Sequence, residues 1–158
     1  MRSMPHIHEL YDFTISAYIV HKDKVLLVNH PRYAMWLPIG GHIELDEDPE
    51  QAFYREVAEE SGLEVELLST APTISTPDDK FIPVPQYLNV HTANNPHKHI
   101  TLVYFARATN NRFVMSAEHT DGRWLSLTEL DDPKYGLSES IKLCCREAVK
   151  AATGAPAQ

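Results

Sequence analysis

The chain has 158 residues, a length typical of one domain with a single core. Its formal net charge of −8 argues against broad, sequence-independent binding to nucleic acid, because such binding needs a basic face. No apolar run approaches the roughly 18 residues that a membrane span needs, and the first ten residues lack the apolar core of a signal peptide. We therefore expect one domain over residues 1–158, with its core at about 11–152, in the cytoplasm and without a membrane partner.

The two cysteines, Cys144 and Cys145, are adjacent in the sequence. Neighbouring residues of a helix point in different directions, so a disulfide between them would be strained. The C-x-x-C pattern of many metal and redox sites is absent. We expect both thiols to be reduced and at least partly buried.

The N-terminal third of the chain predicts strands. Residues 11–20 (YDFTISAYIV) are rich in aromatic and β-branched side chains, and residues 25–29 (VLLVN) form a short apolar run. The polar residues 21–24 between them predict a turn and therefore a hairpin. Further on, residues 35–37 are apolar and residues 42–44 continue as a short extended segment.

A helix is predicted over residues 49–61. Pro49 suits the first helical turn, where its missing N–H is tolerated, and either Asp46 or Asp48 is placed to cap the helix. Gly62 follows at the position where a C-terminal glycine is expected. The helix has an apolar side and a polar side that carries three glutamates.

The remainder of the chain predicts more strands and a second helix. Residues 64–75 are interpreted as a strand, and the prolines that follow predict a loop over 77–85. Residues 86–91 and 100–108 are interpreted as strands separated by a polar turn at 93–98. A short strand at 124–127 and a helix over 137–152 complete the series. Strands outnumber helices, a pattern typical of an α/β fold with a mixed sheet covered by helices on both faces.

The predicted first helix carries a group of carboxylates with metal-binding character. Glu56, Glu59 and Glu60 are spaced i, i+3 and i+4, so they border one face. Like charges at this spacing destabilise a helix unless something neutralises them. Arg55 can neutralise one, and Mg²⁺ or Mn²⁺ can neutralise the others, because hard cations prefer oxygen ligands. Taken alone, the same pattern also fits an ordinary solvated acidic face.

The sequence around these glutamates resembles a known family. Gly41, five residues, Glu47, seven residues and then residues 55–63 (REVAEESGL) match every fixed position of the 23-residue signature of the Nudix hydrolases. The resemblance implies a Nudix fold, an α/β/α sandwich around a mixed β-sheet. It also implies hydrolysis of a nucleoside diphosphate linked to another moiety, in which water attacks phosphorus while Mg²⁺ or Mn²⁺ holds the pyrophosphate.

The resemblance also assigns roles. It implies metal binding by the carbonyl group of Gly40 and the carboxylates of Glu56, Glu59 and Glu60. Arg55 resembles the arginine that orients one of the glutamates, and Glu47 is expected to steady the loop and helix. Many relatives have Pro-Gly-Gly before the motif, whereas this chain has an extra residue, Ile39, which leaves open whether that loop is altered.

Glu118 is a candidate outside the motif. It lies six residues before Trp124, in a segment with loop character. It is similar in position to a glutamate that approaches the metals in the branch of the family that cleanses oxidised nucleotides. Glu118 is therefore a candidate further ligand or general base, alongside Glu56, although a surface glutamate fits the position equally well. Asp121 is a weaker alternative.

Three residues are candidates for binding substrate. Arg32 could contact phosphate and Tyr33 could stack on a base, although solvent exposure explains both positions equally well. His97 and His99 are two apart at the start of a predicted strand, so their side chains should face the same way. We take His99 as the third candidate, although an ordinary polar surface also explains this pair of histidines. Zinc is disfavoured because the sequence shows no third ligand at suitable spacing.

The family resemblance leaves the substrate open. The favoured function is a metal-dependent pyrophosphohydrolase acting on a (d)NTP or an oxidised nucleotide. ADP-ribose and nucleotide sugars are alternative substrates, and a nucleotide-binding or sensing module without hydrolysis is an alternative function. All motif carboxylates are present, which favours catalysis. A homodimer is expected from base rates alone.

Overall fold

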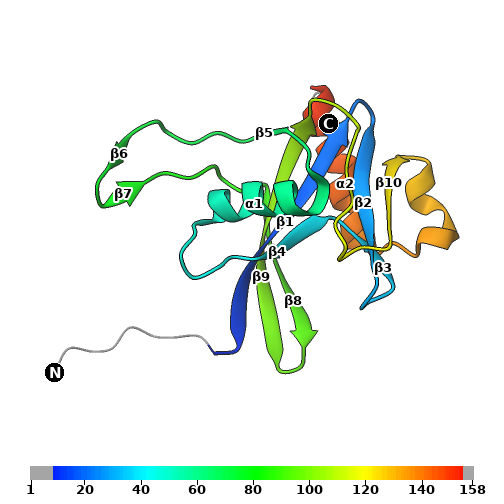
Figure 1. The fold of residues 1–158 in the computed structure, drawn as a ribbon, viewed down its shortest axis with the longest axis horizontal. Coiled ribbons are helices and arrows are strands. Elements are labelled where there is room, and N and C mark those ends of the chain that lie inside the picture. Colours follow the sequence, from blue (N-terminus) through cyan, green and yellow to red (C-terminus); the bar gives the residue numbers. More distant parts are fainter. Residues whose placement is uncertain (1–8, 155–158) are drawn as a thin grey trace.

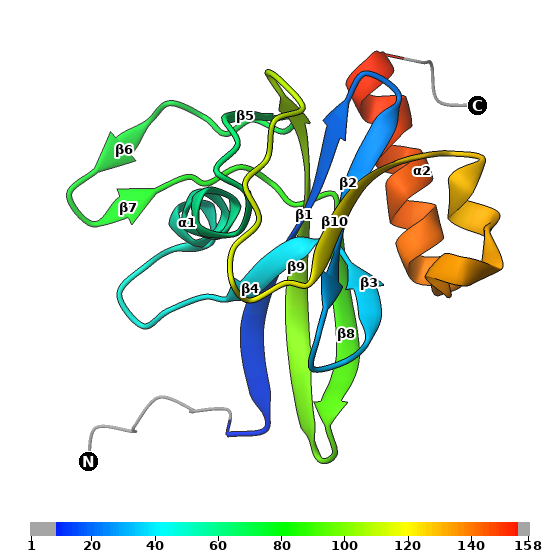
Figure 2. The ribbon, with the colours of Figure 1, turned by 45° about the vertical axis from the view of Figure 1, so that its right-hand side comes forward.

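The computed structural model describes residues 9–154. In this part of the chain, a mixed eight-stranded β-sheet lies between two α-helices, which cover opposite faces (Figures 1 and 2). This arrangement confirms the predicted α/β/α sandwich. No helix within residues 9–154 has both the length and the hydropathy needed to cross a membrane.

Two long parallel strands form the centre of the sheet. β1 (Tyr11–His21) runs beside β9 (His97–Ala108) in a continuous register. β2 (Lys24–His30) returns antiparallel to β1 as the predicted hairpin, and β10 (Asp121–Ser126) pairs with β2. With β5 (Val65–Leu67) beside β9, the main strand order is β10-β2-β1-β9-β5.

Three further strands pair off this main path. β3 (Met35–Leu37) is antiparallel to β2, and β4 (Ile39–His42) is antiparallel to the first half of β1. β8 (Tyr87–Asn94) is antiparallel to the first half of β9. The β8–β9 hairpin extends beyond the helical layers at the bottom of Figure 1, where β1 also begins.

The predicted strand over 64–75 is wrong beyond Leu67. β5 and β8 pair with successive parts of the same edge of β9, and the N–H group of Gln86 already donates to the carbonyl of Val103. A longer β5 would compete with β8 for these positions, so the chain leaves the sheet. The predicted turn over 93–98 is also too long, because both strands of the β8–β9 hairpin extend into it.

The predicted loop over 77–85 contains part of a small hairpin. β6 (Ser75–Thr76) pairs with β7 (Asp79–Lys80), apart from the main sheet. The ammonium group of Lys80 lies 2.9 Å from Asp48 and 3.0 Å from Glu50. These ion pairs attach the hairpin to the N-terminus of the first helix.

Helix α1 (Pro49–Ser61) has the predicted bounds. Asp48, rather than Asp46, is its N-cap, and its side chain accepts a hydrogen bond from the backbone of Gln51. The side chain of Gln51 accepts one in return from the backbone of Asp48, which completes a capping box. Gly62 ends the helix with φ of 62°, a conformation that glycine adopts without steric cost.

Helix α2 (Glu139–Thr153) begins two residues later than predicted because Ser138 is its N-cap. Two short 3-10 helices, η1 (Glu129–Asp131) and η2 (Pro133–Tyr135), lead into it. Both cysteines belong to α2 and are free and buried, as predicted. Alternate residues of β1 and β9 pack against α1 on one face and α2 on the other, so each helix covers its own apolar core.

Candidate active site

A cleft of about 230 Å³ lies where α1 meets two loops. The helix supplies a row of charged side chains, the loop before it supplies Glu44, and the loop between β9 and β10 supplies Ser116 and Glu118. The lining residues are Glu44, Arg55, Glu56, Glu59, Glu60, Ser116 and Glu118. Five of these seven are carboxylates, which makes the cleft a concentrated source of oxygen ligands.

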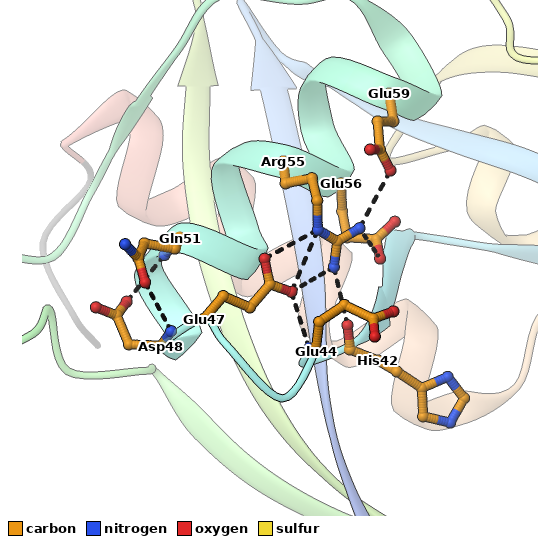
Figure 3. Close-up of polar contacts among 8 residues, drawn as sticks. All are labelled: His42, Glu44, Glu47, Asp48, Gln51, Arg55, Glu56 and Glu59. Carbon is orange, nitrogen blue, oxygen red and sulfur yellow. Dashed lines mark hydrogen bonds and ion pairs between the residues drawn. The ribbon is translucent and has the colours of Figure 1, made fainter.

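Arg55 connects the carboxylates to the backbone (Figure 3). Its Nε atom donates to Glu47 Oε2 at 2.9 Å, and its Nη1 atom donates to Glu56 Oε1 at 2.8 Å and Glu59 Oε2 at 3.1 Å. Its Nη2 atom donates to the carbonyl oxygen of His42 at 3.0 Å. One guanidinium group therefore holds the ends of three glutamates in fixed relative positions.

Glu47 lies behind this arrangement and does not line the cleft. Its Oε1 atom accepts a hydrogen bond from the backbone of Glu44 at 2.9 Å as well as from Arg55. The hydrogen bonds from Arg55 lower the pKa of the Glu47 carboxyl, so it remains charged. The geometry matches the supporting role expected for Glu47.

Glu56 and Glu60 are buried, with 9% and 6% of their surface exposed. Burial raises the pKa of Glu56, and it raises the pKa of Glu60 to about 8, with further contributions from neighbouring carboxylates. Arg55 offsets part of the charge of Glu56, whereas Glu60 has the N–H group of Gly40 and the ring of His119 beside it. Burying a charged carboxylate without full compensation is unfavourable. The donor set therefore fits a hard divalent cation, which would compensate both groups.

The two glycines of β4 bring the backbone close to these carboxylates. A Cβ atom on Gly41 would lie 2.2 Å from Glu56 Oε1, so a side chain there would displace the glutamate. The N–H group of Gly40 donates to Glu60 Oε2 at 3.2 Å. Of the described residues, Gly40 is not among those that line the cleft. Ile39 is fully buried in the core as the first residue of β4, so the extra residue lengthens a strand rather than a loop.

The loop between β9 and β10 brings Glu118 to the cleft and leaves Asp121 outside it. Glu118 lines the cleft, and its charge contributes to the raised pKa values of Glu56 and Glu60. Asp121 instead accepts hydrogen bonds from the backbone of Gly122 at 2.8 Å and from Arg123 at 3.1 Å. The structure thus brings together Glu118 and the helix glutamates.

His119 is a site residue that the sequence analysis missed. Its side chain is 2% exposed, and its Nε2 atom lies 3.1 Å from Glu60 Oε1. Burial and the nearby ring of His30 lower its pKa. A single histidine in a polar loop has no periodic pattern that would predict its contacts. The only indication in the sequence was its position next to Glu118.

The three candidate substrate residues lie outside the acidic cleft. Arg32 lies over the ring of Tyr33 at 5.7 Å, and Tyr33 packs against His30 at 4.7 Å. The His30 ring lies 5.7 Å from the ring of His119, which contacts Glu60. His30 and His119 therefore lie between Tyr33 and Glu60. His99 lies at the start of β9 and contacts other histidines instead.

A second hollow, of about 610 Å³, adjoins the acidic cleft through Glu44. Its lining is mostly apolar, and the residues are Tyr11, Asp12, Phe13, Ile43, Glu44, Leu45, Pro49, Leu88, Ile100 and Leu102. An acidic cleft beside an apolar hollow suits a ligand with a charged group and an apolar body.

Comparison with known proteins identifies the family. The NUDIX domain model matches residues 11–143. A hydrolase of the NUDIX family from Clostridium perfringens is 32% identical, with 89% of this chain and 97% of that chain covered and a TM-score of 0.77. No match was found among curated proteins.

Two further crystal structures share the fold. An Ap4A hydrolase from C. elegans, crystallised as a binary complex, is 19% identical over 90% of this chain and 98% of its own, with a TM-score of 0.69. A MutT NUDIX hydrolase from Burkholderia pseudomallei is 23% identical over 87% and 98%, with a TM-score of 0.64. The NUDIX domain match over residues 11–143 and the 32% identical relative show that the chain belongs to the Nudix family, hydrolases that act on pyrophosphate bonds.

Proposed function

We propose that the protein is a divalent-metal-dependent pyrophosphohydrolase that cleaves a nucleoside diphosphate linked to another moiety. The observation that carries this proposal is the convergence of Glu56, Glu59, Glu60 and Glu118 in one cleft, with two of these carboxylates buried. Such a site favours a bound cation and places that cation within reach of a ligand.

Glu56, Glu59 and Glu60, with the carbonyl of Gly40, would hold the metal. We take it to be Mg²⁺, with Mn²⁺ as the alternative, because both are hard cations that accept oxygen ligands. When bound, such an ion lowers the pKa of a coordinated water and offsets the charge of phosphate oxygens. Arg55 keeps Glu56 and Glu59 in position through its hydrogen bonds.

Either Glu56 or Glu118 accepts a proton from the attacking water. Glu56 is the first candidate because it lines the cleft and its carboxylate is held in position by Arg55. Glu118 lies across the same cleft on a separate loop and is the second candidate. Arg55 lies against Glu56, so a proton transferred to this carboxylate weakens one of the arginine's ion pairs.

For the substrate, we favour a nucleoside triphosphate or an oxidised nucleotide. The position of Glu118 in the cleft supports this choice, since it resembles the glutamate of the nucleotide-cleansing branch. The likeness to an Ap4A hydrolase supports nucleoside polyphosphates more generally. ADP-ribose and nucleotide sugars are the alternatives, and the apolar hollow beside the cleft has room for the remainder of any of them.

The test is a nucleotide panel incubated with Mg²⁺, with the phosphate products followed by chromatography. We expect hydrolysis of at least one compound and its loss in Glu60→Gln. Glu66→Gln, which changes an exposed glutamate on β5, is the matched control and should keep full activity. Tight nucleotide binding without turnover in the unchanged protein would instead support a sensing module.

We also propose a cytoplasmic location and a homodimer. The buried, free cysteines support a reducing compartment. The homodimer is proposed only because homodimers are the most common assemblies of soluble proteins. Sedimentation of the purified protein tests it.

A further inference from the structure

We propose that Asp12, His42 and His99 form a second metal site, one that takes a borderline transition ion such as Zn²⁺. The group lies at the end of the sheet from which the β8–β9 hairpin extends, and it shares no side chain with the carboxylate cleft. The inference does not depend on the proposed hydrolysis.

Sheet register brings these three residues together. Asp12 of β1 pairs directly with His99 of β9, and Thr14 of β1 pairs directly with His42 of β4. Residues 12 and 14 lie on the same face of β1, and paired residues share a face, so all three side chains point to one side of the sheet. Each ligand comes from a different strand.

The separations suit a metal site. One ligand atom from each residue lies within 4.8 Å of the others, and His42 Nε2 is 3.4 Å from Asp12 Oδ2. Ligands at zinc bond lengths in a tetrahedral site are about 3.3 Å apart. Small side-chain rotations would therefore complete the geometry. The side chains of Asp12 and His42 are 48% and 55% exposed, which leaves the site open to an ion from solvent.

Two more histidines surround the three ligands. His97 Nε2 donates a hydrogen bond to Asp12 Oδ2 at 2.8 Å, which fixes the carboxylate in the way that outer partners orient metal ligands. The ring of His91 lies 5.2 Å from that of His99. His91 therefore borders the group, whereas Asp12, His42 and His99 are the residues whose ligand atoms lie within 4.8 Å of one another.

The chemistry of the donors selects the ion. Imidazole nitrogens with one carboxylate are typical zinc ligands, whereas magnesium prefers oxygen alone. Each imidazole ring offers a nitrogen ligand, and the Asp12 carboxylate offers an oxygen ligand.

The carboxylate cleft and the histidine group are adjacent at His42. Its carbonyl oxygen accepts a hydrogen bond from Arg55, while its imidazole ring is directed away from that arginine (Figure 3). The backbone of His42 thus belongs to the carboxylate arrangement and its side chain to the histidine group. The two metals are therefore expected to bind at the same time.

The test is a calorimetric titration of the full chain with ZnCl₂ in excess Mg²⁺, which occupies the carboxylate cleft. We expect one Zn²⁺ per chain in the wild type. His97→Gln removes a residue that hydrogen-bonds to a ligand, and it should weaken zinc binding by roughly 10- to 100-fold. His99→Ala removes a ligand itself and should weaken zinc binding by more than this. Co²⁺ in place of Zn²⁺ should give a visible absorption band that His99→Ala removes.

Two controls make the result specific. His21→Ala changes a histidine at the opposite end of β1 and should keep zinc binding. A His6→Ala/His8→Ala double variant removes histidines that lie outside the described residues, and it should also keep zinc binding. Circular dichroism without zinc checks folding, and Asp12→Asn replaces His99→Ala if that variant does not fold. Unchanged zinc affinity in a folded His99→Ala or Asp12→Asn protein would overturn the proposal.

Discussion

The carboxylate cleft and the histidine group are built in opposite ways although they meet at His42. The cleft takes most of its ligands from two turns of α1, so its residues are close in sequence. The histidine group takes one residue from each of three strands, and Asp12 and His99 are far apart in the chain. A site within one helix can be predicted from spacing, whereas a site assembled by strand pairing depends on the fold.

The two regions also differ in electrostatics. The cleft holds five carboxylates with Arg55 as the cation that lines it, and its buried glutamates have raised pKa values. The histidine group combines the imidazole rings of His42 and His99 with one carboxylate. The first is suited to a hard cation and the second to a borderline one, so changes in one region should leave metal binding in the other intact.

The largest effect should come from Glu56→Gln, which keeps the shape of the side chain and removes its charge. We expect kcat to fall about 10²- to 10³-fold, as when one group that stabilises a transition state is lost. Steady-state kinetics at saturating Mg²⁺ measure the change, with Glu66→Gln as the control. If Glu56→Gln retained half of the wild-type kcat, the proposed role of Glu56 would be wrong.

Arg55→Lys should have the next largest effect. Lysine keeps the positive charge but cannot donate to Glu47, Glu56 and the His42 carbonyl at once. We expect kcat to fall about 10- to 100-fold, with a loss of about 1–3 kcal/mol in the free energy of unfolding. Urea unfolding and kinetics report both. Arg107→Lys, at an exposed arginine that contacts Glu66, is the control and should change neither by a comparable amount.

A smaller effect is expected for Gly41→Ala. The added methyl group would lie 2.2 Å from Glu56 Oε1. Misplacing a catalytic group by about 1 Å can cost up to 10²-fold, and because only the end of one side chain has to move we expect a loss of about 10-fold in kcat.

Gly62→Ala provides the contrast to Gly41→Ala. It meets no neighbouring atom but has a φ of 62°, so it should reduce stability by about 1–2 kcal/mol and leave kcat unchanged. Equal kcat values for the two variants would mean that contact with Glu56 is irrelevant.

The last prediction concerns stability rather than catalysis, and the pH dependence of the metal-free protein. Burial raises the pKa of Glu60 from 4.5 to about 8, so its contribution to stability is complete below about pH 4.5 and is lost as pH rises through 8. In EDTA, the unfolding free energy of the wild type relative to Glu60→Gln should decrease by up to about 1.4 kcal/mol per pH unit over this range. Saturating Mg²⁺ should remove the decrease. A difference that did not change with pH would show that Glu60 titrates normally.

Local features of the fold were predictable and long-range features were not. Pro49 and Gly62 define the ends of α1 through short-range interactions, and the prediction of its bounds is confirmed. The interpretation of 64–75 as one strand failed because β8 occupies the edge of β9 that a longer β5 would need. Nothing within that segment indicates the competition.

The same distinction holds for the sites. The motif predicted which glutamates would lie together on α1, and the structure places Glu118 beside them. His119 could not be identified, because its contact with Glu60 depends on how the loop between β9 and β10 folds against α1. Likewise, Asp12 and His42 become neighbours of His99 only through pairing with β1.

The central claim is that hard-metal chemistry belongs to the carboxylate cleft. Electron paramagnetic resonance of bound Mn²⁺ tests it most directly, on the wild type, Glu60→Gln and His99→Ala. We predict that Glu60→Gln weakens Mn²⁺ binding by more than about tenfold and that His99→Ala leaves it unchanged. Mn²⁺ binding that survives in Glu60→Gln and disappears in His99→Ala would contradict the account.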